Sequence, residues 1–196
     1  MTLRHVLRAT LFGIALAGCA GPGAPRAADA APGRDPSAAE RLNATAAEAM
    51  NADPAAAEGL LRRAVAADPY FGPAHNNLGV LHLTAGRLHE AAQALETARR
   101  LMPGHPDPRL NLALTLEAAG RDADAADAYR AAIEVFPGHV PSLQGLTRLQ
   151  VRSGTADAST ADALREIALR GESDAWRAWA RLELARAGGR GSSVGE

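Results

Sequence analysis

The fold is decided by two consecutive stretches of equal length, GPAHNNLGVLHLTAGRLHEAAQALETARRLMPGH (residues 72–105) and PDPRLNLALTLEAAGRDADAADAYRAAIEVFPGH (residues 106–139). Seven positions of the first stretch agree in kind with the residues 34 further on. The matched positions are Leu78-Gly79, Gly86, Ala91, Leu95, Ala98 and Pro103 in the first stretch, and Leu112-Ala113, Gly120, Ala125, Tyr129, Ala132 and Pro137 in the second. A fixed period of this length indicates a solenoid, in which each unit buries its apolar face by stacking on the next.

Within each repeat, the spacing predicts two helices joined by a short turn. Leu78 and Leu81 share one stripe of a first helix, and Ala91 and Leu95 share one stripe of a second. Gly86 lies between them, where a short turn needs a residue that tolerates positive φ. Small residues such as the glycine after Leu78 are expected where two helices approach closely, and the closing proline ends the second helix.

This pattern resembles the tetratricopeptide repeat family, whose repeat is a helix-turn-helix unit. The family's early Trp is absent, since His75 and Arg109 take its place, and its first-helix Tyr is replaced by His82 and Leu116. The resemblance implies an all-α, right-handed solenoid with a concave partner-binding face and a C-terminal capping helix.

The same offset extends the pattern in both directions. We expect a folded domain over residues 37–187, with repeats at about 38–71, 72–105 and 106–139, a divergent unit at 140–171 and a capping helix at 173–187. Ser37 and Glu40 have the spacing of a capping box, and Ser173 can cap the last helix. Trp176 and Trp179 are interpreted as covering the open end of the solenoid, with an exposed binding hot spot as the alternative.

The N-terminus is interpreted as a processing segment. Residues 1–18 hold Arg4 and Arg8 and then a short apolar run, and the segment is followed by Cys19 in the sequence Leu16-Ala17-Gly18-Cys19. This end resembles the bacterial lipobox, which implies cleavage before Cys19 and lipid on its sulfur; an ordinary secretory signal is the alternative. Ala20 in the next position favours the outer membrane facing the periplasm, by the same resemblance. Residues 19–36 are expected to be a flexible tether, and residues 188–196 a disordered tail.

Composition excludes several classes of protein. The formal net charge of −1 excludes a polybasic nucleic-acid binder, and the single cysteine excludes an internal disulfide. No phosphate loop, Gly-x-Ser-x-Gly or His-Glu-x-x-His motif is present, so no enzymatic activity and no cofactor are expected. The spacing of seven between His75, His82 and His89 does not suit a helical metal site, and His105 and His139 are interpreted as cap residues.

The partner-binding surface is expected on the first helices of the repeats. Asn43, Asn77 and Asn111 recur one per repeat, and an amide carries donors and an acceptor for the backbone of an extended peptide. The alternative is that these amides bond to a neighbouring helix. The expected groove residues are Asn43, Asn76, Asn77, Val80, Leu83, Leu110, Asn111, Leu114, Gln144 and Arg148. This wall is mostly apolar and neutral, which suits a helix or an apolar extended segment of a partner.

Small tetratricopeptide-repeat lipoproteins include accessory proteins of pilus and secretion-channel assembly. The resemblance implies a membrane-anchored scaffold of this kind, held by the lipid on Cys19. A self-associating structural protein, an adaptor for cell-wall enzymes and, more remotely, a metal-binding protein are the alternatives. The oligomeric state is left open by the sequence.

Overall fold

The computed structural model describes residues 33–191, with side chains up to residue 188. This part of the chain is helical and contains no strand. The helices are α2 (Pro36–Ala49), α3 (Pro54–Ala67), α4 (Gly72–Thr84), α5 (Leu88–Leu101), α6 (Asp107–Ala118), α7 (Asp122–Val135), α8 (Val140–Ser153), α9 (Ala158–Arg170) and α10 (Asp174–Gly191).

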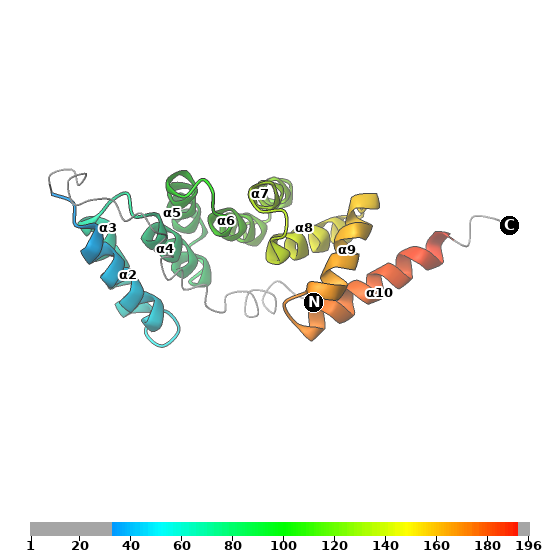
Figure 1. Ribbon diagram of the computed structural model, residues 1–196, viewed down its shortest axis with the longest axis horizontal. Coiled ribbons are helices and arrows are strands. Elements are labelled where there is room, and N and C mark those ends of the chain that lie inside the picture. The colour runs from blue at the N-terminus through cyan, green and yellow to red at the C-terminus, as the bar shows by residue number, and fades with distance from the viewer. Residues whose placement is uncertain (1–32, 192–196) are drawn as a thin grey trace.

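Consecutive helices pack as pairs, α2 with α3, α4 with α5, α6 with α7 and α8 with α9, and α10 packs on α9. The pairs follow one another in an arch (Figure 1). Along this arch α2 contacts α4, α4 contacts α6 and α6 contacts α8, whereas α5 and α7 make no comparable contact within the described residues. The first helices therefore form the inner side of the curve. The predicted all-α solenoid with a final C-terminal helix is confirmed.

The glycines act as their spacing predicts. Gly86 and Gly120 both have φ of +74°, in the left-handed region that side chains rarely adopt. Gly79 faces the second helix of its own repeat, and a Cβ there would lie 2.4 Å from Leu95 Cγ. Close approach of α4 and α5 therefore depends on the missing side chain.

Buried apolar residues form three clusters along the solenoid. One joins α2, α3 and α4, a second joins α4 to α8, and a third joins α9 and α10. In the third cluster, Trp176 is 2% exposed and packs with Leu164, Ile167 and Ala180. The interpretation of Trp176 as the cover of the C-terminal end is confirmed.

The start of the folded part differs from the prediction. Asp35 is the N-cap of α2 and accepts from the Ala38 amide, so the expected capping box at Ser37 is wrong. Arg34 Nε donates to Asp68 Oδ1 at 2.8 Å, and this pair holds the residues before α2 against the end of α3. The predicted tether, which ran to residue 36, therefore extends too far into the folded part.

The C-terminal end also differs, because α10 continues to Gly191, beyond the expected helix end at residue 187. The predicted tail over 188–196 thus starts too early. The lipobox, Cys19 and most of the predicted tether lie outside the described residues. None of the described helices is both long enough and apolar enough to cross a membrane.

Candidate partner-binding surface

Asparagine side chains bond to one another along the inner side of the solenoid. Asn77 Nδ2 donates to Asn43 Oδ1 at 2.9 Å, and Asn111 Nδ2 donates to Asn76 Oδ1 at 3.0 Å. Asn76 Nδ2 lies 3.4 Å from Asn77 Oδ1, which completes a chain of amides from α6 through α4 to α2. The structure thus forms the helix-to-helix bonds that were the alternative to peptide binding.

The apolar groove residues lie on the same helices. Leu83, Leu110 and Leu114 are buried in one cluster that spans α4 and α6. Of the ten expected groove residues, Val80 and Asn111 are partly exposed and the other eight are buried. Binding of a partner at these ten residues stays a prediction.

A buried carboxylate, which the sequence analysis missed, organises the third and fourth units. Arg148 Nη1 and Nη2 donate to Glu117 Oε1 and Oε2 at 2.7 and 2.6 Å. Arg152 Nη1 donates to Glu117 Oε1 at 2.8 Å, and the Tyr129 hydroxyl donates to Glu117 Oε2 at 3.0 Å. This Glu117 network, formed by Glu117, Tyr129, Arg148 and Arg152, ties α6, α7 and α8 together.

The network changes the chemistry expected of Arg148. Its guanidinium is bidentate on Glu117 and does not stand free on a neutral wall. Burial and the Glu117 charge raise the pKa of Tyr129 well above its usual range, so its hydroxyl stays a donor. One signal was available in the sequence, since Glu117 occupies the repeat position of Leu83 and Val151. A carboxylate among apolar equivalents indicates a buried partner of opposite charge.

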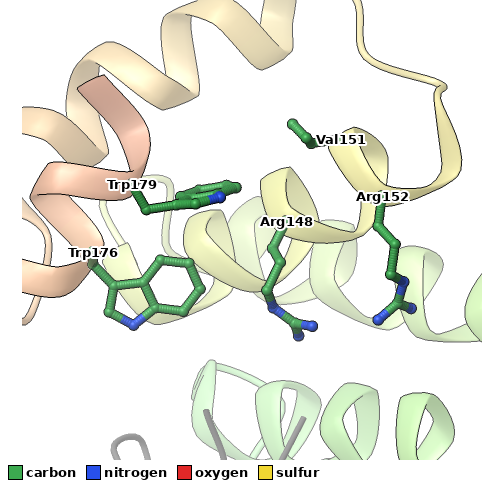
Figure 2. A pocket seen from close by; sticks show the side chains of 5 residues that line it. All are labelled: Arg148, Val151, Arg152, Trp176 and Trp179. Atoms are coloured by element: carbon green, nitrogen blue, oxygen red, sulfur yellow. The ribbon is translucent and has the colours of Figure 1, made fainter. Parts of the chain in front are cut away.

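A pocket of about 190 Å³ opens between α8 and α10. It is lined by Arg148, Val151, Arg152, Trp176 and Trp179. The two indole rings are perpendicular, with centroids 5.3 Å apart. Figure 2 shows the two arginines extending in the same direction from α8, with the tryptophans of α10 beside them.

The histidines serve separate local contacts. His139 Nδ1 lies 2.7 Å from Ser142 Oγ, and His139 Nε2 lies 3.4 Å from Asp107 Oδ1. Although a serine, a histidine and an aspartate are in contact, Ser142 has no exposed surface and cannot reach a substrate. Within residues 33–191, no three His, Cys, Asp or Glu side chains are grouped so that they could hold a metal ion.

Two tetratricopeptide repeat models match the chain, at residues 41–106 and 82–149. Among solved structures, a mutant O-GlcNAc transferase of Thermobaculum terrenum is 26% identical, with a TM-score of 0.61 over 67% of this chain and 26% of the transferase. The present chain thus spans about a quarter of that protein. A crystal structure of MamA shares the fold, at 23% identity and a TM-score of 0.59, over 67% of this chain and 77% of MamA. A search of curated proteins found no match. The repeats, their packing and these matches show that the chain belongs to the tetratricopeptide repeat family.

Proposed function

We propose that this protein is a membrane-anchored scaffold that binds a protein partner on the inner side of its repeats and takes part in assembly of a pilus or secretion complex. The observation that carries the scaffold role is the side-by-side array of α2, α4, α6 and α8. Such an array gives a partner one continuous surface across several repeats. Val80 and Asn111 are the expected groove residues that are partly exposed on this array, because Leu83, Leu110 and Leu114 are buried in the core.

The anchoring part of the proposal depends on Cys19 and the residues before it. Two or more acyl chains would hold the protein stably on a membrane, whereas one chain does so only marginally. The resemblance of Leu16-Ala17-Gly18-Cys19 to a lipobox supports this anchor, and Ala20 supports the outer membrane.

Replacement of the lipidated residue tests the anchor. Cys19→Ser is expected to abolish labelling with radioactive palmitate and to move the protein from the membrane fraction to the soluble fraction. Ala20→Gly is the matched control and should leave both labelling and fractionation unchanged. Wild-type protein without a fatty acid would refute the lipid anchor.

Site-specific photo-crosslinking tests the binding surface. A photoreactive amino acid at Val80, on the inner side of α4, should crosslink to an envelope protein of pilus or secretion assembly. The same group at His89, an exposed residue of α5, is the matched control and should give no such product. Equal crosslinking at both positions would contradict the proposal that the partner binds on the inner side of the repeats.

The identity of the crosslinked protein separates the remaining possibilities. Crosslinks at Val80 to a second copy only would support self-association, and this outcome would exclude the proposed recruitment of a partner. Crosslinks to cell-wall enzymes would replace pilus or secretion assembly with the adaptor function.

A further inference from the structure

The α8–α10 pocket described above differs from the inner surface in its chemistry. Its polar side chains are two arginines and two tryptophans, and these residue types carry N–H donors but no acceptor. Val151 and the indole rings supply the remaining, apolar wall. A ligand that fits this pocket therefore needs acceptor oxygens for the N–H donors and an apolar stem for the apolar wall.

Two of the donors are buried and have no partner. Arg148 Nε and Trp176 Nε1 make no hydrogen bond, although both atoms are inaccessible to water. An unmade hydrogen bond of a buried donor is costly, and the cost is greater for a charged group. Arg148 cannot turn toward another acceptor, because Glu117 holds both of its terminal nitrogens.

The second arginine is held less firmly. Arg152 is 46% exposed and divides its terminal nitrogens between Glu117 and Asp122. Asp122 is itself 48% exposed, and exposed ion pairs contribute little to stability. An incoming carboxylate can therefore displace Asp122 from Arg152 at small cost.

We propose that the α8–α10 pocket binds an acidic side chain of the protein partner. The carboxylate accepts from the exposed guanidinium of Arg152, and the aliphatic stem of the side chain packs on Val151 and the indole rings. The pocket thus adds selectivity for charge near the C-terminal end of the solenoid. This inference rests on the proposed function as a partner-binding scaffold.

The chain contains only two tryptophans, and both line the pocket, so their fluorescence reports on this site alone. The full-length protein is titrated with an acetylated, amidated tripeptide that carries glutamate between two alanines, and with the same peptide carrying glutamine. The glutamate peptide is expected to change the fluorescence saturably and to bind at least about tenfold more tightly, since hydrogen bonds to a charged acceptor are about twice as strong as neutral ones. Equal binding of the two peptides would overturn the proposal.

Substitutions of Arg152 and of its exposed partner Asp122 give a second test, which measures the affinity for the glutamate peptide. Arg152→Gln should weaken binding of the glutamate peptide by about tenfold or more, whereas Asp122→Asn should strengthen it because it removes the competing carboxylate. Arg165→Gln, at an exposed ion pair on α9, is the matched control and should bind like the wild type. If neither Arg152→Gln nor Asp122→Asn changes the affinity, the proposed contacts are wrong.

The outcome is distinguishable from failure of the scaffold proposal. If the Val80 crosslinks persist while the titration shows no preference for glutamate, only the acidic pocket is refuted. If the glutamate peptide binds while Val80 crosslinks to no partner, the inner-surface scaffold is refuted instead.

Discussion

At the scale of single residues, a missing side chain decides how closely two helices pack. A methyl group on Gly79 would lie 2.4 Å from Cγ of Leu95, which is on α5, the second helix of the same repeat. Leu95 has no exposed surface and belongs to the buried apolar cluster, where close packing resists a shift of its side chain. Gly79 is therefore a packing requirement, although a glycine within a helix lowers helix propensity.

Gly79→Ala is expected to lower the free energy of unfolding by about 2 kcal/mol, because overpacking costs more than the gain in helix propensity returns. Equilibrium unfolding in urea measures the change. Gly59→Ala is the matched control, since a Cβ on this α3 glycine would meet nothing within 4 Å. It should instead stabilise the protein by about 0.5–1 kcal/mol. A stabilised Gly79→Ala protein would contradict the packing argument.

At the scale of the element, the start of α9 depends on one carboxylate. Asp157 is the N-cap of α9, and its side chain accepts from the Thr160 amide at 3.0 Å. The Ser159 hydroxyl also donates to it, and these bonds lower the pKa of Asp157 to about 2. Because this pKa is depressed in the folded state, the stabilisation is present above the unfolded pKa of about 4. It is lost as the pH falls toward 2.

We therefore expect the first turn of α9 to open more often as the pH falls from about 4 toward 2, the interval between the unfolded and folded pKa values. Hydrogen exchange of the Thr160 amide, corrected for its intrinsic pH dependence, measures this opening. Asp157→Asn keeps an oxygen acceptor that does not titrate, so protection of Thr160 should lose its pH dependence. An unchanged pH profile in Asp157→Asn would assign the effect to another group.

At the scale of the whole molecule, the Glu117 network joins the third and fourth units. Its side chains come from α6, α7 and α8, and the Glu117 side chain is 1% exposed. Removal of its charge leaves Arg148 buried without a counter-charge, which costs far more than loss of a surface pair. The network therefore contributes to the continuity of the solenoid, beyond the apolar contacts between repeats.

Glu117→Gln is expected to lower the free energy of unfolding by about 3–5 kcal/mol in urea denaturation. Asp127→Asn, which breaks the exposed pair with Arg130, is the matched control and should change it by about 1 kcal/mol or less. Similar effects of the two substitutions would mean that the Glu117 network does not hold the repeats together.

The comparison of sequence and structure follows the same scales. Helix pairing and the glycine turns were predictable, because a turn residue such as Gly86 and a stripe such as Ala91 and Leu95 are local features. The ends of the helices were less predictable from the sequence. Asp35 is the cap in place of Ser37, and Pro36 follows it in the first turn of the helix. This Asp-Pro pair is a local signal for a helix start, which the capping-box interpretation overlooked. The pair between Arg34 and Asp68, which lie 34 residues apart, leaves no such local pattern.

The sequence by itself determined the repeat, the order of the helices and the residues that cover the C-terminal end. Only the tertiary structure decided what the polar inner residues do. In the structure, Asn77 is hydrogen-bonded to Asn43 and Arg148 is paired with Glu117. Residues of α8 and α10 together line the pocket. The physical reason is that a period fixes which residues share a face, whereas a hydrogen bond depends on atoms of different repeats lying within about 3 Å.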